Sequence, residues 1–239
     1  MSRVALVFGG SRGIGAAIAL RLARDGFDVA LTYVSRPDSA ETVAAEIRSM
    51  GRKALPIRAD SADPGAITAA VEEAVVHLGM PDVAVINAGL LRLGSVEGFP
   101  LADLNQMLAV NVRGVFLAIQ ASVARMRDGG RVITIGSNTA VRTGSQGSSV
   151  YAMTKAAVAG MVKGVALDLA PRAITVNNIQ PGPTETDMTA AMAERLKEIV
   201  PLKRIGQPAE IAALASWLAG DEAGYMTGAS LTIDGGYVL

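Results

Sequence analysis

Two side chains in the second half of the chain are spaced for proton-transfer chemistry. Tyr151 and Lys155 stand four positions apart, and residues at that spacing share one face of a helix. On that face the lysine ammonium can stabilise a phenolate and lower the phenol pKa, which is about 10 in an unperturbed side chain. The same spacing also occurs by chance on solvated helix surfaces, so the pair indicates an acid–base site only in company with further residues.

Ser137 supplies such company. It lies just after an expected strand and upstream of Tyr151, where its hydroxyl could hold a carbonyl oxygen beside the phenol. Residues for thiol, metal or histidine chemistry are scarce, because the chain has no cysteine and a single histidine. We interpret that histidine, His77, as a helix-end side chain favoured by the helix dipole. The sequence therefore predicts no metal site, no disulfide and no serine–histidine–aspartate triad.

A glycine-rich turn follows the first expected strand. It reads Gly9-Gly-Ser-Arg-Gly-Ile-Gly15 and leads into a helical run. Such a strand-to-helix turn lets backbone N–H groups approach a pyrophosphate at the helix N-terminus. The strict spacing of three glycines is not met, because Ile18 stands where the third would be. A purely structural turn is therefore the alternative.

The second expected strand ends without the acidic residue that, about 20 residues after such a turn, would bind adenosine ribose hydroxyls. In its place the chain reads Tyr33-Val-Ser-Arg36. Ser35, Arg36 and Arg12 could engage a 2′-phosphate, which favours NADPH over NADH as the cofactor. The alternative for Arg36 is an ordinary solvated surface charge.

Short β-rich runs alternate with longer helical patterns along the whole chain. Such alternation predicts a doubly wound, Rossmann-type α/β fold with one parallel seven-stranded sheet and helices on both faces. Ligands of such sheets bind beyond the carboxyl ends of the strands. The expected strands cover residues 4–8, 28–34, 54–58, 83–86, 131–135, 174–179 and 230–233, and the expected helices cover residues 13–25, 39–50, 64–78, 101–127, 150–170, 187–199 and 208–219.

Length and composition limit the organisation and the partners. The 239 residues fit a single dinucleotide-binding domain, 1–239, with no internal repeat or linker. Lys+Arg and Asp+Glu both total 22, so there is no basic field for nucleic acid or anionic lipid. We also expect no signal peptide and no stretch of the ~18–20 apolar residues that a membrane span needs. The sequence thus predicts a cytoplasmic protein that binds neither nucleic acid nor membrane.

With these residues in order, the sequence resembles the short-chain dehydrogenase/reductase family, in its single-domain subtype, over nearly its whole length. Within the family the pattern is most similar to β-ketoacyl-acyl-carrier-protein reductases. The residues that carry the resemblance are Gly9, Gly13 and Gly15 in the first turn, Asp60 after the third strand, Asn87-Ala-Gly89 after the fourth, then Asn111, Ser137, Tyr151, Lys155, and Pro181-Gly-Pro-Thr-Glu-Thr-Asp-Met188 after the sixth.

The resemblance implies a catalytic tetrad. Tyr151 would donate the proton and Ser137 would hold the carbonyl oxygen. Lys155 would lower the phenol pKa and hold the nicotinamide ribose hydroxyls, and Asn111 would anchor a water that passes protons to Lys155. The resemblance also implies that Asp60 lies near the adenine, that Asn87 to Gly89 line the ribose and nicotinamide, and that Pro181, Gly182 and Thr186 hold the carboxamide side. The full set of expected cofactor-binding residues is Gly9, Ser11, Arg12, Gly13, Ile14, Gly15, Tyr33, Ser35, Arg36, Asp60, Ser61, Asn87, Ala88, Gly89, Tyr151, Lys155, Pro181, Gly182, Thr184 and Thr186.

Two positions depart from the family pattern. Phe8 stands where a threonine is usual before the first glycine, and Ile86 stands where an asparagine is usual before Asn87. Each departure removes a supporting hydrogen bond rather than a reacting group. We interpret both departures as variation within the family.

Taken together, the residues and the resemblance predict an NADPH-dependent carbonyl reductase. It would transfer hydride between NADP(H) and a ketone or alcohol, such as a 3-oxoacyl thioester or a small ketone. Two alternatives stay open: a nucleotide-binding regulatory protein that keeps the fold and signals by ligand occupancy, and an NAD-dependent alcohol dehydrogenase. The residues expected to line the substrate pocket are Leu90, Leu91, Asn138, Arg142, Gln146, Val150 and Met188.

The helix expected to carry Tyr151 and Lys155 is apolar almost all round, whereas a helix that covers a sheet needs only one apolar stripe. Either a loop of the same chain or a second copy must cover its outer face. The resemblance implies dimers built on this helix and on the apolar run 101–126, and commonly tetramers. We therefore expect a homo-oligomer, a dimer or tetramer with two-fold symmetry. The small residues that would let another helix approach closely are Ala157, Gly160 and Gly164.

Overall fold

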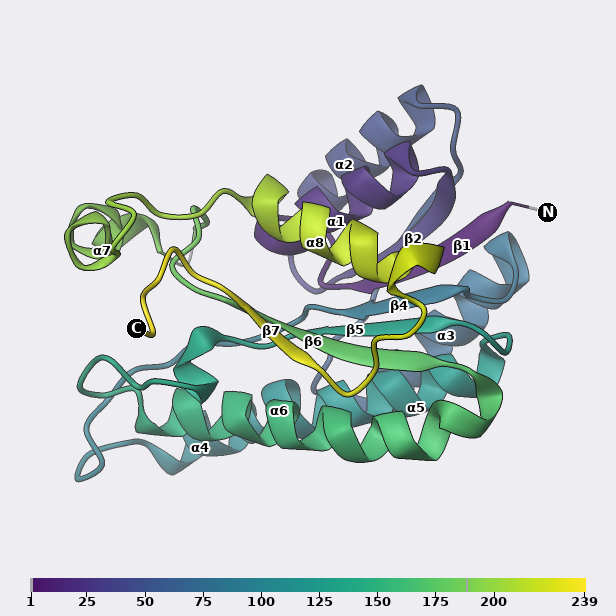
Figure 1. Cartoon of the computed structure of the whole chain (residues 1–239). Coiled ribbons are helices and arrows are strands. Elements are labelled where there is room, and N and C mark those ends of the chain that lie inside the picture. Colours follow the sequence, from purple (N-terminus) through teal and green to yellow (C-terminus); the bar gives the residue numbers. More distant parts are fainter. Residues whose placement is uncertain (1, 188) are drawn as a thin grey trace.

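The computed structural model describes residues 2–187 and 189–239, and these residues form a seven-stranded sheet in which every neighbouring pair is parallel (Figure 1). The order is β3-β2-β1-β4-β5-β6-β7, which confirms the predicted Rossmann-like α/β fold. All seven expected strands are present, with small displacements at their ends. Their bounds are β1 (Arg3–Phe8), β2 (Phe27–Tyr33), β3 (Ala54–Arg58), β4 (Val83–Ile86), β5 (Arg131–Ile135), β6 (Thr175–Pro181) and β7 (Ser230–Ile233).

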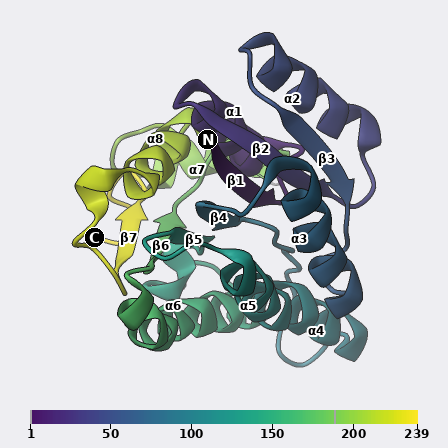
Figure 2. The same cartoon turned by 90° about the vertical axis from the view of Figure 1, so that its right-hand side faces the viewer.

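Helices cover both faces of the sheet (Figure 2). Because water reaches neither face, the central strands are continuous apolar runs rather than alternating ones; β4, for example, is buried over its whole length. One face carries α1 (Gly13–Arg24), α2 (Pro37–Ser49) and α8 (Pro208–Ala219), and the other carries α3 (Pro64–Leu78), α5 (Val115–Arg125) and α6 (Ser149–Leu169). Two further helices are α4 (Leu101–Leu108), which leads toward α5, and α7 (Ala193–Ile199), which lies beyond one end of the sheet (Figure 1).

The ends of α3 follow the local rules for helix capping. The Asp63 carboxylate accepts hydrogen bonds from the backbone N–H groups of Gly65 and Ala66 at 2.8 and 3.3 Å, as an N-cap residue should. His77 lies in the last turn of this helix, with its Nδ1 2.9 Å from the carbonyl oxygen of Glu73. The prediction of a helix-end histidine is therefore confirmed.

The expected continuous helix over 101–127 is wrong in detail. A π-helical segment, Ala109–Gly114, separates α4 from α5, and α5 ends at Arg125. The segment lies close to the backbone of the loop after β3, since a Cβ on Gly114 would lie 2.2 Å from the carbonyl oxygen of Ser61. Such π segments are frequent at functional sites, and this one carries Asn111, which is only 1% exposed.

Two helical stretches, 101–125 and 149–172, are long and apolar enough to cross a membrane by length and composition alone. This finding corrects the expectation that no part of the chain would pass that test. Both stretches lie against the same side of the sheet (Figure 2), where core helices of globular proteins pass the test as well. Only 39% and 33% of their most apolar windows are buried, so both keep an apolar outer face. On α6 that face includes Met153 and Leu167, together with the expected small residues Ala157, Gly160 and Gly164.

Candidate active site

Lys155 lies on the buried side of α6 with 5% of its surface exposed. Its Nζ donates a hydrogen bond to the carbonyl oxygen of Ile135, at the end of β5, over 2.9 Å. None of the ion pairs among the described residues includes this ammonium. Burial therefore disfavours the charge and lowers the pKa of Lys155 to about 8. Lys155 can therefore lose its positive charge within the pH range in which most enzymes work.

Tyr151 lies one helical turn before Lys155, and the lysine Nζ is 5.7 Å from the centroid of its ring. Desolvation raises the pKa of Tyr151 to about 12, while a hydrogen bond with the Ser137 side chain acts in the opposite direction. The expectation that the ammonium would bring the phenol pKa below its usual value is thus not met, because the cost of burying a phenolate is larger. The phenol is protonated at neutral pH.

Ser137 is buried and follows β5. Its Oγ accepts hydrogen bonds from the backbone N–H and the hydroxyl of Thr139, at 3.2 and 2.9 Å. A hydroxyl has two acceptor positions and one proton, so Thr139 leaves Ser137 its proton to donate. That proton is available to the phenol of Tyr151, whose pKa Ser137 lowers.

Asn111 ties the segment after β4 to α6. Its side chain accepts from the N–H of Leu90 and donates to the carbonyl oxygen of Leu90, each over 2.8 Å, and donates to the Thr154 hydroxyl over 3.2 Å. Both amide protons are therefore committed. A Cβ on Gly89 would lie 3.6 Å from the Lys155 Nζ and 3.8 Å from the Asn111 Oδ1, so the structure brings all four residues of the expected tetrad to one place.

The glycine-rich turn has the backbone that its sequence predicts. Gly9 and Gly13 have φ angles of 74° and 53°, which L side chains rarely adopt. A Cβ on Gly15 would lie 2.1 Å from the carbonyl oxygen of Gly9. The Thr32 hydroxyl accepts from the Gly9 N–H over 2.9 Å, and the Asn87 side chain donates to the Gly9 carbonyl over 2.8 Å. These two contacts brace the turn and the end of β4 together.

Two exposed arginines from separate elements meet beside this turn. Arg12 precedes α1, and Arg36 precedes α2. One Nη1 of each lies against the same oxygen, the Oδ2 of Asp187, at 3.1 and 3.3 Å. Two guanidinium groups that converge on one anionic oxygen are arranged to bind a single anion.

The other expected cofactor-binding residues lie at the same carboxyl edge of the sheet. Asp60 accepts a hydrogen bond from the N–H of Ala62 over 2.9 Å. Ala88 packs closely against Gly9, since a Cβ on Gly9 would lie 3.0 Å from the Ala88 Cα. A Cβ on Gly13 would lie 3.2 Å from the Thr186 Cγ2. Ser61, Pro181 and Thr184 are buried, whereas Ser11, Ile14, Tyr33 and Gly182 are partly exposed and Ser35 is exposed.

The predicted substrate pocket needs a correction. The Arg142 guanidinium donates to the carbonyl oxygens of Tyr237 and Leu239 at 3.0 and 2.9 Å, and the Asn138 amide donates to the Asp234 carboxylate at 3.2 Å. These polar groups hold the C-terminal segment 234–239 rather than stand free for a substrate. Leu90, Leu91 and Val150 are partly buried and Gln146 is exposed; Met188 lies outside the described residues.

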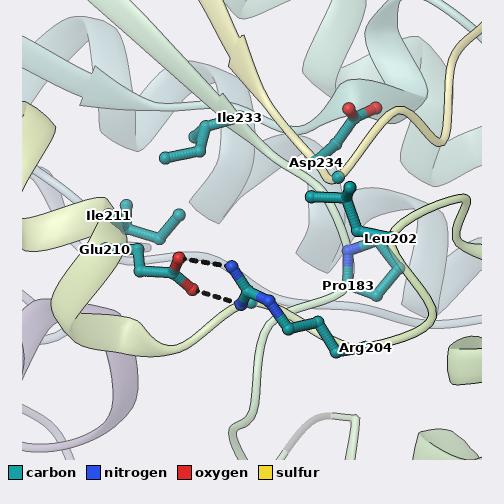
Figure 3. A pocket seen from close by; sticks show the side chains of 9 residues that line it. Pro183, Leu202, Arg204, Glu210, Ile211, Ile233 and Asp234 are labelled. Carbon is teal, nitrogen blue, oxygen red and sulfur yellow. Dashed lines mark hydrogen bonds and ion pairs between the residues drawn. The ribbon is translucent and has the colours of Figure 1, made fainter.

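A separate small cavity, of about 130 Å³, lies beyond the ends of β6 and β7 (Figure 3). Arg204 and Glu210 face each other across it through two hydrogen bonds of 2.7 Å. The Arg204 guanidinium and the Gln207 N–H lower the pKa of Glu210 to about 2. None of the expected site residues lines this cavity. We interpret the ion pair as a contact that stabilises the loop before α8.

Sequence reasoning missed several side chains and backbone groups that shape the site. Asp187 lies in the segment 181–188 that carries the family resemblance, but the sequence assigns it no role, and Thr32 lies within an expected strand. Their polar character was visible, but which groups they face depends on loop paths that sequence spacing does not specify. The hydrogen bonds of the Ile135 carbonyl and of the Leu90 backbone cannot be predicted from side-chain patterns, because backbone groups are the same at every position.

Comparison with known proteins gives consistent results. A family model described as enoyl-(acyl carrier protein) reductase matches residues 9–238. The chain is 38% identical over 245 residues to a 3-oxoacyl-[acyl-carrier-protein] reductase of Staphylococcus aureus. This alignment covers 100% of this chain and 99% of that protein. The chain is also 38% identical over 238 residues to a cyclic-di-GMP-binding biofilm dispersal mediator protein of Escherichia coli, which covers 98% and 97%.

Solved structures agree with the whole fold. A short-chain dehydrogenase/reductase from Serratia marcescens superposes with a TM-score of 0.97 at 52% identity, over 99% of this chain and 98% of that chain. A short-chain dehydrogenase from Burkholderia cenocepacia, solved in complex with NADP, superposes with a TM-score of 0.97 at 44% identity, again over 99% and 98%.

Proposed function

The chain belongs to the short-chain dehydrogenase/reductase family, and we propose that within this family of oxidoreductases it is an NADPH-dependent carbonyl reductase. The observation that carries the proposal is the meeting of a protonated phenol, a serine hydroxyl and a buried ammonium at the edge of the sheet that also carries the glycine-rich turn. A proton donor and a dinucleotide-binding turn at one edge are what reduction of a carbonyl group by a bound nicotinamide requires.

The residues of the turn fit a dinucleotide. Gly9, Gly13 and Gly15 present backbone that a Cβ would block, and a structure of a relative was solved with NADP. Arg12 and Arg36 would hold the 2′-phosphate that distinguishes NADPH from NADH, because both guanidinium groups reach one anionic oxygen. When bound, the nicotinamide supplies the hydride.

The side chains of this protein would place and polarise the carbonyl group. Ser137, oriented by Thr139, would donate its proton to the carbonyl oxygen. Tyr151 would transfer its phenolic proton to the same oxygen as negative charge develops there. Lys155 would offset the phenolate charge that this transfer leaves. Asn111 would hold the Leu90 segment in position, and its role as a water anchor stays a prediction.

The protonated phenol is suited to donate a proton to a carbonyl oxygen. At a pKa of about 12, Tyr151 carries its proton at neutral pH, and an alkoxide is a stronger base than a phenolate, so transfer of the proton to the product is favourable. The two arginines near the expected ribose site favour NADP(H) over NAD(H). NAD-dependent alcohol oxidation is therefore the weaker interpretation.

A second candidate is a nucleotide-binding regulatory protein. It is favoured by one observation, the 38% identity to a cyclic-di-GMP-binding biofilm dispersal mediator protein. Titration of the purified protein with cyclic-di-GMP and with NADP+ separates the candidates. We expect saturable binding of NADP+, and reduction of at least one carbonyl compound in a panel of acetoacetyl thioesters, diketones and aryl ketones. Tight binding of cyclic-di-GMP, with no turnover on the panel, would favour the regulatory role.

The apolar outer faces of α5 and α6 support a homo-oligomer of two-fold symmetry, a dimer or tetramer, in which a second copy covers these faces. Phe116 on α5 and Leu167 on α6 are 45% and 78% exposed. A Cβ on Gly160 or Gly164 would meet no atom within 4 Å, so another helix can approach closely. The cytoplasmic location expected from the sequence stays a prediction.

Replacement of Tyr151 tests the proposed acid. Tyr151→Phe removes the proton donor and keeps the ring, so turnover on the best ketone should fall by about 10²–10⁴-fold, while the Kd for NADP+ changes little. Tyr225→Phe is the matched control, since Tyr225 is fully exposed, and it should leave turnover unchanged. Turnover of Tyr151→Phe within about twofold of the unmodified protein would remove Tyr151 from this role.

Replacement of Arg36 tests the cofactor assignment. Arg36→Ala should weaken binding of NADPH by about tenfold or more and change NADH binding little, because a hydrogen bond to a charged group contributes about 1.5–3 kcal/mol. Arg24→Ala, which removes another exposed arginine with a single ion pair, is the control. Equal losses for both cofactors would show that Arg36 acts through packing.

The mass in solution tests the oligomer. Sedimentation at micromolar concentration should give a multiple of the 24.5 kDa chain mass. Gly160→Glu should shift the protein toward the monomer, because it places a charge on the outer face of α6 without a clash within the chain. Gly98→Glu, at another glycine with open space around it, should not. A monomeric mass for the unmodified protein would contradict the proposal.

A further inference from the structure

Asp187 occupies the position between the two arginines that the proposed function assigns to a phosphate. Its Oδ2 is 3.1 Å from the Arg12 Nη1 and 3.3 Å from the Arg36 Nη1. All three side chains are more than half exposed, and ion pairs at such exposure are weak. The contact can therefore open at little cost when a stronger anion arrives.

The segment that carries Asp187 lies directly over the glycine-rich turn. Its neighbour Thr186 packs against Gly13, where a Cβ would come within 3.2 Å of the threonine methyl group. The segment is fastened independently of Asp187, because the Glu185 N–H donates to the Gly206 carbonyl over 2.9 Å and the Thr186 N–H donates to the Thr189 hydroxyl over 3.1 Å. Loss of the Asp187 charge should accordingly leave the path of the segment intact.

We propose that Asp187 is a specificity-determining residue, whose carboxylate competes with the 2′-phosphate of the cofactor for Arg12 and Arg36. A phosphate monoester carries a charge of about −1.5 to −2 at pH 7 and offers three acceptor oxygens, against one shared carboxylate oxygen here. The phosphate thus displaces the carboxylate, while a cofactor without the phosphate leaves the ion pairs closed. The inference rests on the proposed NADPH-binding function and deepens it.

The competition has a consequence that simple repulsion lacks. A carboxylate that only repelled the cofactor would also weaken NADP+ more than NAD+, because the 2′-phosphate adds negative charge, but that repulsion would persist after Arg36 is removed. A carboxylate that occupies the two guanidinium groups weakens the ligand that needs them, and its effect depends on Arg36. Asp187→Asn should therefore tighten NADP+ by about twofold to tenfold, the range expected when two weak exposed ion pairs no longer compete, and change NAD+ by less than about twofold.

Isothermal titration of the full chain with NADP+ and with NAD+ tests this inference. Glu185→Gln is the matched control: it removes a neighbouring exposed acid that pairs with Gln207 at 2.7 Å rather than with an arginine, and it should change neither affinity. In the Arg36→Ala background, Asp187→Asn should lose most of its effect. An unchanged or weakened NADP+ affinity in Asp187→Asn, or an equal gain for NAD+, overturns the role of Asp187.

The same titrations distinguish that failure from failure of the cofactor assignment. If Arg36→Ala weakens NADP+ while Asp187→Asn leaves the ratio of the two affinities unchanged, the arginines bind the phosphate and Asp187 does not compete. If Arg36→Ala leaves the NADP+ affinity unchanged, the assignment of the phosphate site itself is wrong, and the inference about Asp187 is wrong with it.

Discussion

The burial of one ammonium group constrains the rest of the site. Lys155 is held by a single backbone carbonyl, that of Ile135, in a region that water does not reach. A cation so placed is unfavourable, and the packing of α6 on the sheet through Val158, Val162 and Ala166 must offset it. The same burial raises the pKa of the nearby Tyr151 phenol to about 12. One desolvated pocket thus shifts the pKa of both groups.

The topology explains why distant segments meet in this pocket. From the centre of the sheet, β1, β2 and β3 follow one another toward one edge, and β4 to β7 follow one another toward the other. The connections that leave the neighbouring strands β1 and β4 therefore run in opposite directions. In such sheets ligands bind at that switch point. The turn after β1 and the Asn87 segment after β4 both lie there and are hydrogen-bonded to each other through Gly9. The fold therefore places the dinucleotide turn and the proton donors at one edge before any specific contact is made.

Most of the fold, and the proximity of the expected site residues, could be predicted from the sequence, because they depend on local rules. Alternating strand and helix patterns gave the sheet, and the spacing of Tyr151 and Lys155 gave one helix face. Three features could not be predicted. The π segment around Asn111 depends on a close backbone approach at Gly114, the raised phenol pKa depends on how much water the folded site excludes, and the contacts of Asp187 and Arg142 depend on loop paths. Each arises from tertiary packing, which leaves no local signal.

The state of the buried lysine is the most direct measure of this account. Carbon-13 NMR of protein labelled at the lysine ε-carbon, with the resonance assigned through Lys155→Arg, follows the ammonium without any substrate. We expect the Lys155 resonance to titrate near pH 8, because burial lowers its pKa from the usual lysine value of about 10.4. Titration of Lys155 at the usual lysine value would contradict the claim that a desolvated ammonium governs the site.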